Sequence, residues 1–178
     1  MSTQDITPLL TEAEARLAAD DFDGAVALCH QAVAAAPTSA LAHSKLGVAF
    51  VRRRQWEEAR AEFSRAVQLD PRYAPAHSNL GNVYREQGRL DEAVACYQKA
   101  VAVDPDYWIA HQNLGIVYKQ QGRVADAVRE FKTSTRLSLR SSRTADGAVP
   151  GTRTKRVGCL GGGMAMLLGV ALAALRRQ

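Results

Sequence analysis

Apolar residues recur along the chain at helical spacing, in paired segments that a short polar turn separates. In residues 74–103, Leu80, Val83 and Tyr84 share one face of a first expected helix. After the turn, the apolar positions of a second helix are Leu90, Val94, Tyr97, Val101 and Val103. Apolar residues spaced by three and four positions lie on one side of a helix. The pattern therefore predicts helix-turn-helix units, each of which buries one face.

This pattern repeats with a period of 34 residues. Residues that recur at this spacing are Pro37, Pro71 and Pro105, Gly47, Gly81 and Gly115, and Ala25, Ala59, Ala93 and Ala127. A single unit cannot bury its apolar face, so self-similarity of this period predicts stacked repeats. We expect four units in residues 1–139, at about 6–39, 40–73, 74–107 and 108–139.

Small residues have a steric role in these units. Gly81, Ala93 and Ala100 leave room for two helices to approach, while Tyr84 and Tyr97 fill the space beside them. Asp104 and Pro105 end the second helix, because proline disfavours helical geometry in the preceding residue.

The repeat resembles the tetratricopeptide repeat (TPR) family. The residues that carry the resemblance are Leu46-Gly47, Phe50, Ala59, Phe63, Ala66 and Pro71, then Leu80-Gly81, Tyr84, Ala93, Tyr97, Ala100 and Pro105, then Leu114-Gly115, Tyr118, Ala127 and Phe131. The resemblance covers roughly residues 6–139. It implies an all-α, right-handed solenoid whose first helices line a concave groove for peptides or partner helices.

The end units depart from the family pattern. Arg16 and Cys29 stand where the first unit should carry aromatic residues. Ser134 and Leu139 replace the usual alanine and proline of the last unit. End repeats commonly degenerate, since one face meets water or another element.

The family geometry also implies which residues line the groove. The candidate partner-binding residues are Ser44, Lys45, Ser78, Asn79, Asn82, Arg85, Gln112, Asn113 and Lys119. The groove lining also includes Val48 and Ile116. Asn79 and Asn113 lie one repeat apart, in a pattern similar to the asparagine ladder of O-GlcNAc transferase. Such a ladder can hold a peptide backbone, since an amide both donates and accepts hydrogen bonds. The alternative is that both are solvated groove residues.

Two other binding modes are less favoured. The clamp with which some family members hold a chaperone's C-terminal carboxylate needs lysine and asparagine on the first helix, and both are missing. Arg52, Arg53 and Arg54 form a basic turn that fits an acidic partner, although a charge run is more often a solvated loop.

The sequence indicates no catalytic, cofactor or metal site. His43, His77 and His111 recur at the repeat period, but helices packed 8–10 Å apart cannot bring two imidazoles to one metal. We expect these histidines to be partly buried at the seams between units. The segment 20–24 lacks the ligands of a calcium loop, and no phosphate loop or nucleophile elbow is present. We therefore do not expect an enzyme.

Charge argues against a nucleic-acid partner. The chain has 23 Lys and Arg residues and 18 Asp and Glu residues. Residues 1–136 hold 16 of the basic and 17 of the acidic residues. The remaining 7 basic residues and 1 acidic residue lie in the tail, which therefore carries the excess positive charge. A nucleic-acid-binding fold would carry its basic residues on the folded part. Cys29, Cys96 and Cys159 show neither metal-ligand nor disulfide spacing, which favours a reducing compartment. No signal peptide is recognisable at the N-terminus.

The C-terminal region predicts a membrane anchor. Residues 140–156 read as a flexible basic linker, and residues 157–175 carry no charge. As a helix, the latter would span about 28 Å, close to the thickness of a bilayer core. Basic residues before this segment favour a cytoplasmic solenoid at a single-pass, tail-anchored position, which we expect to be the bacterial cytoplasmic membrane. A ridge of small residues suggests a homodimer through Gly161, Ala165, Gly169 and Ala173.

Together these features predict a non-catalytic adaptor or scaffold that binds a protein or peptide in its groove and holds it at a membrane. One alternative is a structural subunit of a membrane-associated complex. Another is a soluble regulator whose tail covers its own groove.

Overall fold

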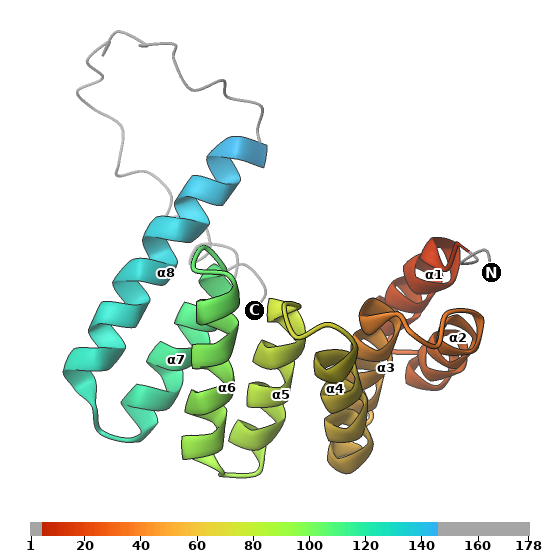
Figure 1. Cartoon of the computed structure of the whole chain (residues 1–178), viewed down its shortest axis with the longest axis horizontal. Coiled ribbons are helices and arrows are strands. Elements are labelled where there is room, and N and C mark those ends of the chain that lie inside the picture. The colour runs from red at the N-terminus through yellow and green to blue at the C-terminus, as the bar shows by residue number, and fades with distance from the viewer. Residues whose placement is uncertain (1–4, 146–178) are drawn as a thin grey trace, which may run out of the picture. The chain divides into compact units, whose positions relative to one another are not determined.

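The computed structural model describes residues 5–145, which form eight α-helices and no strands within that range. Figure 1 shows the helices side by side along one array. They are α1 Thr7–Ala18, α2 Phe22–Ala35, α3 Ala40–Arg52, α4 Trp56–Leu69, α5 Ala74–Glu86, α6 Leu90–Val103, α7 Trp108–Gln120 and α8 Val124–Ala145. In each pair, the odd-numbered helix is the first helix and the even-numbered helix the second. The expected all-α class is confirmed.

The turn inside each pair has one left-handed residue at the repeat period. Gly88 and Gly122 occupy this position with φ of 75° and 76°, and Asp20 and Arg54 with φ of 58° and 60°. Glycine adopts this conformation without the Cβ clash that other residues meet. The segment 20–24 therefore forms the turn between α1 and α2 and the beginning of α2. Asp21 caps α2 by accepting a hydrogen bond from the backbone N–H of Gly24.

Within each of the last three pairs, a glycine on the first helix faces an aromatic ring on the second. A Cβ atom at Gly47 would lie 2.7 Å from the ring of Phe63, one at Gly81 2.7 Å from that of Tyr97, and one at Gly115 2.6 Å from that of Phe131. No real Cβ tolerates such distances, so the absence of a side chain sets the separation of the two helices.

The first pair solves the same packing problem with different residues. Ala13 stands at the glycine position and Cys29 at the ring position, and both are buried. The added methyl group of Ala13 is matched by the smaller side chain of Cys29. The first pair thus departs from the family residues but conserves the packed volume, because a larger residue on α1 faces a smaller one on α2.

Neighbouring pairs are joined by a polar contact that also recurs every 34 residues. It links the end of each first helix to the beginning of the preceding second helix. Arg53 pairs with Asp23 at 3.2 Å, Gln87 donates to Glu57 at 2.9 Å, and Gln121 donates to Asp91 at 2.8 Å. These contacts fix the register between pairs at the edge of the apolar seam.

The array curves so that the first helices lie on its inner side. The second helices α2, α4 and α6 each pack against their own first helix and the first helix of the next pair, while α8 packs against α7. The first helices also contact one another, in the pairs α1–α3, α3–α5 and α5–α7. Within residues 5–145, no two second helices come within 8 Å between Cα atoms. Closer spacing on one side makes that side concave, as in other helical solenoids.

Helix α8 is longer than the sequence predicts. The expected linker begins at residue 140, yet α8 continues to Ala145. Leu139 occupies the position of Pro71 and Pro105, and without proline nothing removes a backbone donor or disfavours helical geometry there. Among the helices of the described range, none is long and apolar enough to cross a membrane. The predicted anchor at 157–175 and its small-residue ridge lie outside the described residues.

The glycine-ring contact predicts a large effect of Gly81→Leu. The new side chain would overlap the Tyr97 ring and push α5 and α6 apart, which should lower the free energy of unfolding by about 3 kcal/mol or more. Urea unfolding followed by circular dichroism measures this. Ala95→Leu is the matched control, since Ala95 is exposed on α6. Equal unfolding midpoints for the two variants would contradict the proposed packing.

The exchange in the first pair predicts a rescue. Cys29→Phe alone should be destabilising, because the ring meets the Cβ of Ala13. Combined with Ala13→Gly, it should recreate the packing of the later pairs. We expect a coupling free energy of about 1–3 kcal/mol between the two sites in a double-mutant cycle. Strictly additive changes would show that the two positions do not compensate each other.

Candidate functional site

The predicted partner-binding residues lie on the first helices α3, α5 and α7, on the concave side of the array. Their exposure divides them into three groups. Gln112 and Lys119 are exposed, Lys45, Asn79, Asn82 and Arg85 are half-buried, and Ser44, Ser78 and Asn113 are buried. Six of the nine therefore present side chains at the surface. We call these six the inner-face residues.

The three buried residues have an internal role. Asn113 is only 9% exposed, and its amide donates to the Ser78 hydroxyl at 3.3 Å, joining α7 to α5. Ser44 occupies the same repeat position as Ser78 on α3 and is equally buried. The expectation that these side chains line the groove surface is not met, since neighbouring first helices cover them.

The predicted asparagine ladder consequently has unequal rungs. Asn113 uses its amide inside the protein, whereas Asn79 is half-buried on the inner face. At the preceding repeat position, Lys45 pairs with Glu14 of α1. This repeat position thus joins neighbouring first helices in the second and the fourth pair. Only Asn79 is left as an accessible amide of the ladder.

Asn82 is tied to the core. The Tyr97 hydroxyl, at the end of a fully buried ring, donates to Asn82 Oδ1 at 2.7 Å. Burial raises the pKa of this phenol, so it stays protonated and able to donate. In the neighbouring pairs the ring belongs to phenylalanine, and the residues equivalent to Asn82 are Val48 and Ile116. An amide is therefore present at position 82, where the facing ring carries a hydroxyl, and an apolar residue is present where the ring has none.

The charges of the inner face are partly neutralised. Lys45 pairs with Glu14, and Arg85 with Glu86 at 3.1 Å. Lys119 has no acidic partner within residues 5–145. The accessible groups are thus two amides, on Asn79 and Gln112, and one unpaired ammonium group. This arrangement suits the backbone of an extended peptide with an acidic group near Lys119.

The recurring histidines are structural. Each is buried, and its Nε2 atom faces the carbonyl oxygen of the proline that ends the preceding pair, at 2.9 to 3.1 Å. His43 and His111 also place Nδ1 at 2.6 and 2.7 Å from Glu62 and Glu130 of their own second helices. Within the described residues, no cluster of His, Cys, Asp and Glu could hold a metal ion.

The basic turn formed by Arg52, Arg53 and Arg54 is engaged within the protein. Arg52 pairs with Asp20 at 3.0 Å and lies over the Phe22 ring, while Arg53 pairs with Asp23. Two of its three charges are therefore matched, one by Asp20 in the turn between α1 and α2 and one by Asp23 in the first turn of α2. The interpretation as a solvated, structural turn is favoured over that of a site for an acidic partner.

Neither described cysteine is suited to chemistry. Cys29 and Cys96 are free thiols in the core. Burial raises the pKa of the Cys29 thiol to about 11 and also raises that of Cys96. Because the thiolate is the nucleophile and the metal ligand, both remain inert near neutral pH. Cys159 lies outside the described residues.

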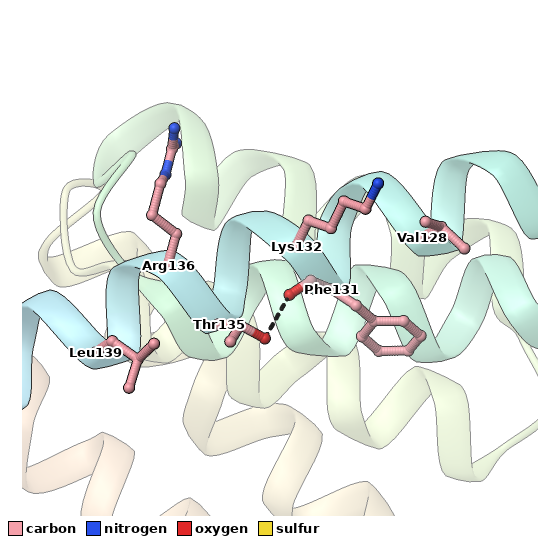
Figure 2. Close-up of a pocket in the computed structure, with 6 residues that line it drawn as sticks. All are labelled: Val128, Phe131, Lys132, Thr135, Arg136 and Leu139. Atoms are coloured by element: carbon pink, nitrogen blue, oxygen red, sulfur yellow. Dashed lines mark hydrogen bonds between the residues drawn. The ribbon is translucent and has the colours of Figure 1, made fainter. Parts of the chain in front are cut away.

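A second surface lies on the outward side of α8. None of its residues is among the predicted partner-binding residues. Figure 2 shows its lining on one face of this helix: Val128, Phe131, Lys132, Thr135, Arg136 and Leu139. The signal for it in the sequence is the repeat itself. In earlier pairs, the next first helix covers these positions of the second helix. Among residues 5–145, no further first helix follows α8. We call it the α8 outward face.

Comparison with known proteins identifies the repeat. The family model for the TPR repeat matches residues 49–88 and 81–122. Residues 49–122 therefore match the tetratricopeptide repeat, as the sequence predicts for that part of the chain. Comparison with curated protein sequences yields no match.

Solved structures share the fold. A crystal structure of MamA superposes with a TM-score of 0.66 and 27% identity, over 78% of this chain and 81% of that one. The pilF protein of Pseudomonas aeruginosa gives a TM-score of 0.68 and 28% identity, over 74% of this chain and 60% of that one. The first TPR domain of Spaghetti (RPAP3), bound to the HSP90 peptide SRMEEVD, gives a TM-score of 0.62 and 19% identity, over 68% of this chain and 97% of that one. At 19% identity, the last shows a shared fold alone.

The different environments of Asn79 and Asn113 predict different effects on stability. Asn113→Ala removes a buried hydrogen bond and leaves the Ser78 hydroxyl without its partner, which should cost about 1–3 kcal/mol. Asn79→Ala should change stability by no more than about 0.5 kcal/mol. Thermal and urea unfolding of both variants test this. Equal losses would mean that the two asparagines are equivalent after all.

Proposed function

We propose that the chain is a non-catalytic interaction module that binds an extended peptide along the inner face of its TPR repeats. The observation that carries the proposal is that the adjacent first helices α5 and α7 leave Asn79, Gln112 and Lys119 at the surface, without a side-chain hydrogen bond or ion pair among residues 5–145. Gln112 holds the repeat position of the buried Ser44 and Ser78, and it is exposed because no further first helix follows α7 in that range. The peptide held by the RPAP3 domain is an example of a ligand bound by this fold.

The proposed ligand is defined by the groups it would meet. The amides of Asn79 and Gln112 can both donate to and accept from a peptide backbone, so they select an extended main chain rather than particular side chains. Lys119 favours an acidic residue at one end of the segment. The half-buried Arg85 is held by Glu86 and contributes less.

The location that we propose is a membrane. Residues 157–175 carry no charge and, as a helix, are long enough to cross a bilayer core of about 30 Å. Arg153, Lys155 and Arg156 precede this segment and favour a cytoplasmic position for the repeats. The module would then concentrate its partner at the cytoplasmic membrane, as a tail-anchored adaptor.

Binding is tested with a peptide selected from a displayed random library on the full chain in detergent. Lys119→Ala and Asn79→Ala should each weaken binding by about 1 kcal/mol, or roughly fivefold in Kd, without changing stability. Lys99→Ala is the matched control, because Lys99 is exposed on the outer side of α6. The proposal fails if Lys99→Ala weakens binding as much as the inner-face variants.

Attachment is tested separately by expressing the full chain and a version that ends at Pro150, and by washing cell membranes with alkaline carbonate. We expect only the full chain to stay in the membrane pellet. If both versions are released into the supernatant, residues 157–175 are not an integral anchor.

A further inference from the structure

The α8 outward face repeats a surface that is covered elsewhere in the protein. On α6, Leu90, Val94 and Val101 pack against the core that α7 completes. The equivalent positions on α8 are Val124, Val128 and Thr135. Val124 is 64% exposed, Val128 45% and Leu139 58%. The result is an exposed apolar stripe along more than three turns of α8.

One flank of this stripe is basic. Lys132 and Arg136 stand where α6 carries Gln98 and Ala102. Neither has an acidic partner among residues 5–145, whereas Arg129 pairs with Asp126 on another side of the helix. Figure 2 shows both side chains extending from the same helix that carries Val128 and Leu139. An apolar stripe beside unpaired cationic side chains is the pattern of a helix at an anionic membrane surface.

A second copy of the chain fits this face poorly. Gln98 donates to the Tyr118 hydroxyl across the seam between α6 and α7. Head-to-tail stacking would continue the repeat and place Lys132 opposite Arg16, which holds the position of Tyr118. It would also bring Glu12, at the position of Leu114, onto Val124 and Val128. A two-fold pairing of α8 with itself would instead oppose Lys132 and Arg136 to their own copies.

The tail of the chain is not complementary either. Residues 157–175 have no acidic side chain to pair with Lys132 and Arg136, and they end in Arg176 and Arg177. Instead, the chain beyond α8 favours a bilayer. Residues 146–156 can span at most about 40 Å when extended. An anchor at 157–175 would therefore hold the end of α8 within that distance of the lipid headgroups.

We propose that the α8 outward face lies on an anionic lipid surface, with its apolar stripe at the acyl boundary and Lys132 and Arg136 at the headgroup phosphates. This rests on the membrane attachment proposed above, but not on peptide binding. The last repeat would then lie closest to the bilayer. The inner face would be held in a defined orientation, rather than at the end of a free tether.

The experiment uses the full chain carrying Cys159→Ser, in which the buried Cys29 and Cys96 do not react. An environment-sensitive fluorophore is attached at Val128→Cys, or at Ala15→Cys on the exposed side of α1 as a control. Each protein is reconstituted into vesicles of phosphatidylcholine alone or with about 30% phosphatidylglycerol, an anionic lipid. Vesicle flotation reports the anchor, and quenching by brominated lipid reports insertion of the label.

We expect all proteins to float with both vesicles. The label at position 128, but not that at 15, should be quenched in anionic vesicles. Lys132→Glu combined with Arg136→Glu should lose most of this quenching, and so should raising the salt concentration.

Two results overturn the inference and leave the anchor intact. One is flotation without quenching at position 128. The other is a blue-shifted label that brominated lipid does not quench in either vesicle, which means that protein, such as the chain's own tail, covers the face. Failure to float would overturn both the anchor and the inference.

Discussion

The contact between a helical glycine and an aromatic ring is the constraint on which the rest of the structure depends. At Gly47, Gly81 and Gly115 the ring of the facing helix occupies the place of a side chain, so each pair of helices has one permitted separation. Because that separation recurs, the next pair meets the same surface, and the seam contacts from Arg53, Gln87 and Gln121 recur with it. The curvature that brings first helices side by side follows. So does the inner face on which the proposed binding function depends.

Much of this architecture could be predicted from the sequence, since the residues that recur every 34 positions have steric roles. Glycine, alanine and proline report close approaches and helix ends directly. Two features escaped the prediction. The first pair appeared degenerate because Ala13 and Cys29 had to be considered together before their compensation was apparent. Helix α8 was predicted to end too early, because the composition after Leu139 resembles a linker although the residue that stops a helix is missing.

The candidate site was harder to predict than the fold. Position within a first helix indicates which side chains face inward, but not which of them a neighbouring first helix covers. Ser44, Ser78 and Asn113 face inward and are buried for that reason. Asn82 reaches the surface while accepting a hydrogen bond from Tyr97, a link between residues on different helices. A partner-binding site on a repeat protein is thus what remains after the contacts between repeats are made. On this chain the site that we propose comprises Asn79, Gln112 and Lys119.

The central claim is that partners bind on the inner face. It is tested most directly by photo-crosslinking in cells with a photoreactive amino acid placed at Gln112 or at Lys99. If partners bind on the inner face, position 112 gives a discrete crosslinked product in the membrane fraction, and position 99 on the outer side of α6 gives none. A product from position 99 alone, or the same product from both positions, would contradict this claim.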